Sequence, residues 1–176
     1  ATVFTSGGNL RCPFCHNAPL VTRPEEAEDL TEEAVLDFLA GRRGLLDGVV
    51  LSGGEPLLQP GVEEILARVR DMGYAIKLDT NGCYPRRLQE LLGRGMVDYV
   101  AMDIKNSLEK YAETVGCPGF DTTAVKESAA LLMEGDVDFE FRTTAVKPFH
   151  TSEDMEAIGR WLSGAPRYFL QTFVDS

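Results

Sequence analysis

Two cysteines separated by two residues form the most reactive stretch of this sequence. Cys12 and Cys15 stand in Cys-Pro-Phe-Cys-His-Asn, shortly after an apolar, β-prone run at residues 1–5. A C-x-x-C pair can bind zinc, form a redox-active disulfide or hold part of an iron–sulfur cluster. Zinc is the least favoured of the three, because His16 and His150 are the only histidines and no second C-x-x-C exists.

Polar groups that could do chemistry also follow or end four later apolar runs. They are Gly53-Gly54-Glu55, Asp79-Thr80-Asn81, the pair Asp103 and Lys105, and Arg142. In a barrel of parallel strands the carboxyl ends of the strands meet on one face, and the chemistry is found there. We therefore expect these residues and the two cysteines to converge on one site.

Strands and helices alternate along the chain. Apolar runs predict strands over residues 1–5, 47–51, 74–79, 97–103, 137–144 and 168–174. Helix patterns and caps predict helices over 31–41, 60–73, from 85, over 122–133 and from 151, with a loop over 19–29. Strict alternation implies parallel strands. No helix opens with a phosphate-binding glycine loop, as nucleotide-binding open sheets do, so the predicted fold is α/β, a partial (β/α)6 TIM-like barrel.

Bulk composition narrows the class of protein. The 176 residues, 44% hydrophobic, can form one domain over 1–176 with a sizeable core. A net charge of −11 disfavours nucleic acid and anionic membranes as partners, and no apolar run is long enough to span a bilayer. Four cysteines without an even framework predict a reducing, cytoplasmic location. The chain begins inside a strand-like run, so we expect some native N-terminal residues to be missing.

Taken in order, four motifs resemble those of the radical S-adenosylmethionine superfamily. They are Cys-Pro-Phe-Cys-His-Asn, Gly-Gly-Glu-Pro, Asp-Thr-Asn-Gly and Met-Asp-Ile-Lys. Within the superfamily they most resemble the activating enzymes of glycyl radical enzymes, such as the activators of anaerobic ribonucleotide reductase and of pyruvate formate-lyase. Each motif is weak alone, but the four together, each at a predicted strand end, make a specific signal.

This resemblance implies an oxygen-sensitive enzyme with a [4Fe–4S] cluster and S-adenosylmethionine. Three cysteine thiolates would hold the cluster and leave one iron open. An electron from a donor such as flavodoxin or ferredoxin would then cleave S-adenosylmethionine to a 5′-deoxyadenosyl radical. In the activating enzymes that radical takes a hydrogen from a glycine Cα of a partner glycyl radical enzyme.

The resemblance also assigns roles to residues. Cys12 and Cys15 would bind the cluster, and Asp103 and Lys105 would be the catalytic residues. The residues expected to contact S-adenosylmethionine are Phe14 beside the adenine, Gly53, Gly54 and Glu55 at the methionyl amine, and Asp79, Asn81, Asp103, Lys105 and Arg142 around the ribose and carboxylate. A monovalent cation is expected near Asp79, Thr80 and Asp103.

One position departs from the family pattern C-x-x-x-C-x-x-C. The first cysteine of that pattern falls on Gly8, which has no ligand atom. Three interpretations follow: an altered copy of an active enzyme, a natural relative that has lost catalysis, or a site completed by Cys83 or Cys117. We favour the first two over the third, because a distant ligand must be placed within a few tenths of an ångström.

Simpler interpretations exist for each motif. Gly53-Gly54 can be an ordinary turn, and Asp103 with Lys105 can be a surface ion pair worth less than about 1 kcal/mol. Arg142 can pair with Glu140 or Asp138. Two alternative functions also remain: a non-catalytic barrel that binds S-adenosylmethionine or a partner, and a radical enzyme acting on a small molecule.

Overall fold

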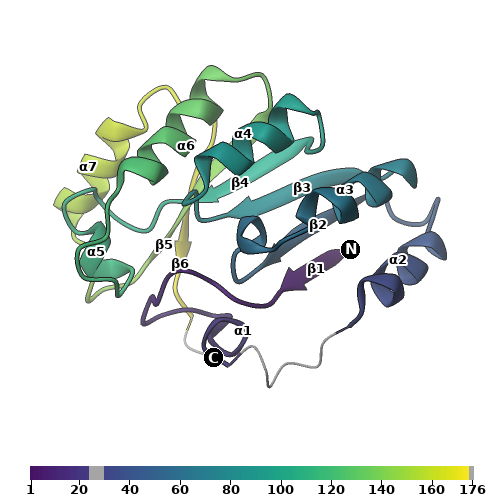
Figure 1. Ribbon diagram of the computed structural model, residues 1–176. Coiled ribbons are helices and arrows are strands. Elements are labelled where there is room, and N and C mark those ends of the chain that lie inside the picture. Colours follow the sequence, from purple (N-terminus) through teal and green to yellow (C-terminus); the bar gives the residue numbers. More distant parts are fainter. Residues whose placement is uncertain (24–29, 175–176) are drawn as a thin grey trace.

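The computed structural model describes residues 1–23 and 30–174. Its centre is one sheet of six parallel strands in the sequential order β1-β2-β3-β4-β5-β6, which curves through the molecule (Figure 1). The strands are β1 (Thr2–Thr5), β2 (Gly48–Gly53), β3 (Ala75–Thr80), β4 (Tyr99–Asp103), β5 (Asp138–Ala145) and β6 (Tyr168–Thr172). The sequential order and the parallel pairing confirm the predicted partial barrel.

Helices connect the strands and cover the outer face of the sheet (Figure 1). They are α2 (Glu32–Ala40), α3 (Val62–Asp71), α4 (Pro85–Gly93), α6 (Thr123–Glu134) and α7 (Ser152–Trp161), with the short α1 (Ala18–Thr22), α5 (Tyr111–Thr114) and the 3-10 turn η2 (Pro56–Leu58). Their starts follow the expected capping chemistry. Thr31 accepts a hydrogen bond from the Ala34 N–H, and Thr151 forms a capping box with Asp154.

One predicted loop is partly wrong. Residues 19–22, expected to be irregular, lie in α1, where Pro19 occupies the first turn and its missing N–H costs nothing. The rest of that predicted loop, residues 24–29, lies outside the described residues.

The two faces of the sheet differ because strand side chains alternate. On the outer face, buried apolar residues pack under the helices: Val49, Leu51, Ile76, Leu78, Val100, Met102, Phe139 and Phe141. The alternate positions on the inner face are largely polar or charged: Ser52, Lys77, Asp79, Tyr99, Asp103, Glu140 and Arg142. The alternation therefore carries the chemistry-bearing side chains to the concave side of the barrel.

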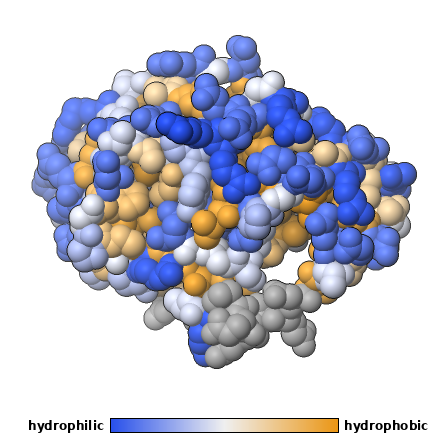
Figure 2. Space-filling model, in the orientation of Figure 1, coloured by the Kyte–Doolittle hydropathy of each residue, from blue (hydrophilic) through white to orange (hydrophobic). Residues whose placement is uncertain are grey.

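Hydrophilic side chains dominate the face shown in Figure 2, with smaller hydrophobic patches between them. Among the described residues, no helix has the length and apolar character needed to cross a membrane.

Candidate cofactor site

A cavity of about 240 Å³ opens at the carboxyl ends of the strands. It brings together the cysteine loop and the polar ends of β2 to β5, as the sequence predicted. Its lining includes all but one of the predicted site residues: Cys12, Phe14, Cys15, Gly53, Gly54, Asp79, Asn81, Asp103, Lys105 and Arg142.

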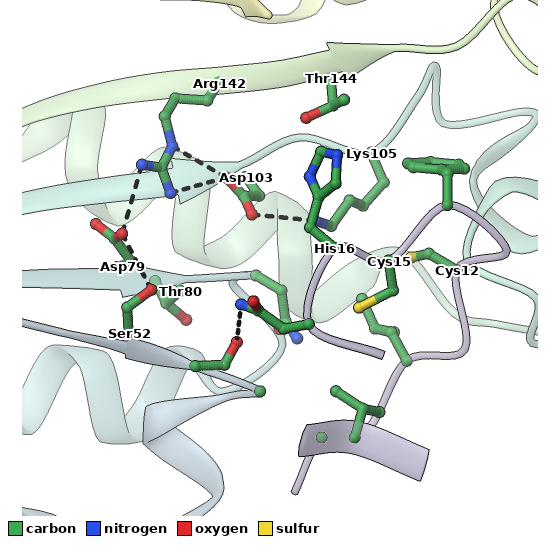
Figure 3. Close-up of a pocket in the computed structure, with 18 of the residues that line it drawn as sticks. Cys12, Cys15, His16, Ser52, Asp79, Thr80, Asp103, Lys105, Arg142 and Thr144 are labelled. Atoms are coloured by element: carbon green, nitrogen blue, oxygen red, sulfur yellow. Dashed lines mark hydrogen bonds and ion pairs between the residues drawn. The ribbon is translucent and has the colours of Figure 1, made fainter. Parts of the chain in front are cut away.

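A row of ion-paired side chains lies along the wall of this cavity (Figure 3). Arg142 lies between two carboxylates, with Nη2 at 3.0 Å from Oδ1 of Asp103 and Nη1 at 3.5 Å from Oδ2 of Asp79. Lys105 Nζ lies 3.0 Å from the other oxygen of Asp103. The Ser52 hydroxyl donates to Asp79 at 3.2 Å. Two cations therefore share two carboxylates, and the cluster as a whole is neutral.

The pKa shifts of Asp103 and Lys105 favour their charged forms. Burial alone would raise the pKa of Asp103, but Lys105 and Arg142 outweigh it and hold that pKa below its usual range. For Lys105, burial acts to lower the pKa, and Asp103 outweighs it, so the pKa is raised. The predicted alternative that Arg142 pairs with Glu140 or Asp138 is wrong, since its ion-pair partners are Asp103 and Asp79.

Asp79 keeps one unsatisfied oxygen. Its Oδ1 is buried and accepts no hydrogen bond from the described residues, although Lys77 Nζ lies 3.7 Å away. A buried carboxylate oxygen without a donor is costly unless something else binds it. Within the described residues, the ion pair with Lys77 is therefore the contact that offsets the burial of this oxygen.

Glu55 is the predicted site residue that does not line the cavity. Its side chain is fully buried and accepts three hydrogen bonds, from the Leu57 N–H at 3.1 Å, the Thr80 hydroxyl at 2.8 Å and the Asn81 N–H at 2.8 Å. Burial raises the pKa of Glu55 to about 7, against the opposing effect of these donors. In this structure Glu55 therefore ties the end of β2 to the end of β3 and is not among the residues that line the cavity.

Gly53 and Gly54 have a packing reason to be glycine. A Cβ on Gly53 would overlap the backbone of Thr5, and a Cβ on Gly54 would overlap the carbonyl of Gly7. Gly53 also has φ +124, which L side chains rarely adopt. These glycines let the cysteine loop lie directly on the end of β2, and they line the cavity as well.

The cysteine loop is held from several sides. Cys12 and Cys15 both line the cavity, and burial raises the pKa of Cys12 although Lys105 opposes the shift. Phe14, between them, packs 5.4 Å from the Phe149 ring. The His16 ring stacks on Phe173 at 5.0 Å. The end of β6 therefore covers one side of the loop.

Two of the four cysteines lie apart from the cavity. All four cysteines are free thiols, but Cys83 and Cys117 do not line the cavity. Burial raises the pKa of Cys83 to about 12. Within residues 1–23 and 30–174, no group of three or more His, Cys, Asp or Glu side chains could hold a metal ion. The two favoured interpretations, an altered copy and a non-catalytic relative, stay predictions, as does the third.

The fit to the two implied groups is therefore uneven. Paired charges of both signs and the unsatisfied Asp79 oxygen suit a ligand such as S-adenosylmethionine, which carries an ammonium, a carboxylate and a sulfonium. The thiols present do not suit a site-differentiated [4Fe–4S] cluster, which needs three.

Several lining residues were not singled out from the sequence. The polar ones include Asn9, Ser52, Thr144 and Gln171. Ser52 and Thr144 were detectable, because they continue the inward alternation of β2 and β5 to the strand ends. Asn9 was not detectable, since its role is a 2.8 Å hydrogen bond from Asn81, a residue far away in the sequence.

Comparison with known sequences identifies relatives over nearly the whole chain. The model of the Radical SAM superfamily matches residues 2–162. A candidate glycyl-radical enzyme activating enzyme of Methanocaldococcus jannaschii is 34% identical over 98% of this chain and 72% of its own length. The pyruvate formate-lyase-activating enzyme of Staphylococcus aureus is 32% identical over 66% of this chain and 51% of its own length. The chain thus spans only about half of that relative.

Solved structures show the same fold. Streptococcus suis SuiB bound to S-adenosylmethionine superposes with a TM-score of 0.79 at 14% identity, over 99% of this chain and 40% of that one. The enzyme anSMEcpe with bound AdoMet gives a TM-score of 0.78 at 17% identity, over 99% of this chain and 51% of the other. At such identities the likeness concerns the fold alone.

Proposed function

Because this chain belongs to the radical SAM superfamily, we propose that its cavity binds S-adenosylmethionine for an enzyme that activates a glycyl radical enzyme. The observation that carries the proposal is the cavity in which two cysteine thiols face the Asp79–Arg142–Asp103–Lys105 chain. The glycyl-radical assignment is supported by the names of the relatives in Methanocaldococcus jannaschii and Staphylococcus aureus.

The charges of the cavity suit S-adenosylmethionine group by group. Arg142 and Lys105 line the cavity and can donate hydrogen bonds to the carboxylate of S-adenosylmethionine. Asp79 and Asp103 can accept hydrogen bonds from its ribose hydroxyls or its ammonium. Phe14 offers an apolar face for the adenine. With a reduced cluster beside it, S-adenosylmethionine held in this way would supply a 5′-deoxyadenosyl radical. The chain's own side chains bind, orient and shield it.

Three further parts of the proposal concern molecules outside this chain. The protein substrate is a glycyl radical enzyme, and the electron donor is a small reducing protein such as flavodoxin or ferredoxin. A monovalent cation near Asp79, Thr80 and Asp103 is favoured by the unsatisfied Oδ1 of Asp79. Arg142 already forms ion pairs with both carboxylates, so such a cation would bind mainly to Oδ1 of Asp79.

A second candidate function is a non-catalytic barrel that binds S-adenosylmethionine or a partner protein. Gly8 favours it, because the loop then offers two thiolates in place of three. A radical reaction on a small molecule uses the same cofactor site, and differs from the main proposal only in substrate.

Calorimetric titration of S-adenosylmethionine into the purified chain tests the shared first step. We expect measurable binding, and we expect Arg142→Met to weaken it by about tenfold or more, because a hydrogen bond to a charged group contributes ~1.5–3 kcal/mol. Glu90→Gln, which removes an exposed carboxylate on α4, serves as the matched control and should bind like the parent. Equal affinity in all three proteins, or no binding by any, would contradict the proposed site.

A further inference from the structure

Cys12 and Cys15 are the two ends of one tight turn. The Cys15 N–H donates to the Cys12 carbonyl at 3.1 Å, which closes a β-turn with Pro13 and Phe14 at its centre. The φ of Phe14 is not positive, which excludes a type II turn and agrees with type I, where proline favours the first central position. A β-turn holds its end Cα atoms less than about 7 Å apart. Disulfides join Cα atoms roughly 4.4–6.8 Å apart, so the backbone spacing is compatible with a disulfide.

This turn is held in place by contacts that do not involve the two sulfurs. Just before it, the Arg11 N–H donates to the Val115 carbonyl at 2.9 Å, and just after it, the Ala18 N–H donates to the Cys15 carbonyl at 3.2 Å. Both cysteines are free thiols, partly exposed, and both line the cavity (Figure 3). A bond between the sulfurs can therefore form by rotation of the two side chains while these backbone contacts stay in place.

Two thiols suffice for a disulfide but not for the cluster that the family pattern would place here. Position 8, where that pattern has a cysteine, is glycine, and a Cβ built there would lie 3.1 and 3.2 Å from the two methyl carbons of Val21. Val21 also lines the cavity. An apolar side chain therefore borders the position from which a third thiolate would come. A disulfide is the reaction that the two cysteines can complete by themselves.

We propose that Cys12 and Cys15 are a modification site, a dithiol that exchanges with small-molecule disulfides and is converted reversibly to an intramolecular disulfide. One cysteine thiolate attacks the small disulfide, forms a mixed disulfide and releases one thiolate. The other cysteine thiolate then attacks the cysteine sulfur of that mixed disulfide, closes the Cys12–Cys15 bond and releases the second thiolate. The two cysteine protons pass to the released thiolates, and the two electrons that the cysteines lose reduce the small disulfide. This activity goes beyond the proposed function and does not depend on the binding of S-adenosylmethionine.

Anaerobic equilibration of the purified chain with 2-mercaptoethanol and its disulfide, 2-hydroxyethyl disulfide, tests the proposal. After acid quenching and alkylation of the remaining thiols, mass spectrometry of the peptides shows which cysteines are joined. At half-oxidation, the squared concentration of the thiol divided by that of the disulfide gives the effective concentration of the two cysteines. A flexible linker gives roughly millimolar values, and because the turn holds the pair close, we expect a value at least about tenfold higher.

Variants separate the two steps and test the turn. Cys15→Ser should stop at the mixed disulfide on Cys12. Pro13→Gly keeps both thiols but loosens the turn, so the effective concentration should fall by about two- to fivefold. The matched control is the double variant Cys83→Ser, Cys117→Ser, which removes the two thiols outside the cavity lining and should match the parent.

Three results would overturn the inference. They are an effective concentration at or below the roughly millimolar value of a flexible linker, a disulfide that joins Cys12 or Cys15 to Cys83 or Cys117, and an equal effective concentration in the parent and in Pro13→Gly. Failure of the calorimetric titration with S-adenosylmethionine would contradict the proposed function and leave this inference standing.

Discussion

Glu55→Gln is the sharpest test of how the site is held together. The carboxylate of Glu55 is fully buried and receives donors from Leu57, Thr80 and Asn81. Glutamine has the same shape, but its amide nitrogen is a donor that must face either the Leu57 or the Asn81 N–H. We expect the variant to be less stable at acid pH by about 1–3 kcal/mol, the cost of leaving a buried donor unsatisfied.

The difference in unfolding free energy between Glu55→Gln and the parent should depend on pH, and the pKa of Glu55 sets how strongly. The pKa of Glu55 is about 7 in the folded protein, above its ordinary value of 4.5, because burial penalises the charged form. Between these two values the folded state binds more protons than the unfolded state, so the stability of the parent falls as pH rises. From pH 5.5 to 7, at up to 1.36 kcal/mol per unit, this loss is about 1.5 kcal/mol. Glutamine does not titrate, so the gap between variant and parent should close over this range.

Urea unfolding at intervals from pH 5.5 to 8 measures both proteins. The lower limit stays above the sequence pI of 4.6 to avoid precipitation. At each pH the unfolding free energy of the parent is subtracted from that of the variant, so that the contributions of all other titrating groups cancel. Glu90→Gln, on an exposed position, should show no pH-dependent difference. A constant gap between Glu55→Gln and its parent across the range would refute the reasoning, since it would mean that the three donors keep Glu55 ionised throughout.

Two further substitutions test the supports of the site. Gly54→Ala should destabilise the chain and displace the cysteine loop, because its Cβ would overlap the Gly7 carbonyl; urea unfolding should show a loss of several kcal/mol, while Gly159→Ala, whose Cβ meets nothing within 4 Å, should be neutral or stabilising by about 0.5–1 kcal/mol. Unchanged stability of Gly54→Ala would show that this loop is not packed as described. Asp154→Asn should cost about 2 kcal/mol, because Asp154 completes the α7 capping box and lies 2.8 Å from Lys110 Nζ; thermal unfolding measures it, and an equal cost of Glu153→Gln on the same helix turn would argue against that specific role.

The architecture was readable from the sequence because local patterns dominate it. Each predicted strand lies within about two residues of its observed bounds. Apolar periodicity and the residues that start and stop helices are both visible within short segments of sequence. The loop predicted over 19–29 failed at α1, where a five-residue helix carries too little periodic pattern to detect. The convergence of Cys12, Asp79, Asp103, Lys105 and Arg142 followed from topology alone, because parallel strands bring their carboxyl ends to one side.

The tertiary structure alone decided which residue does what within that site. Glu55 follows Gly53 and Gly54 in the sequence, yet it turns behind the cavity wall to bind the end of β3. The two glycines are required by the backbone of Thr5 and Gly7, distant residues whose approach no local pattern encodes. Arg142 forms ion pairs with Asp79 and Asp103, and not with nearby Glu140, because the strand register places those two carboxylates beside it. Side-chain type and spacing are local and can be read along the chain, whereas the partner of a buried charge depends on which strands become neighbours.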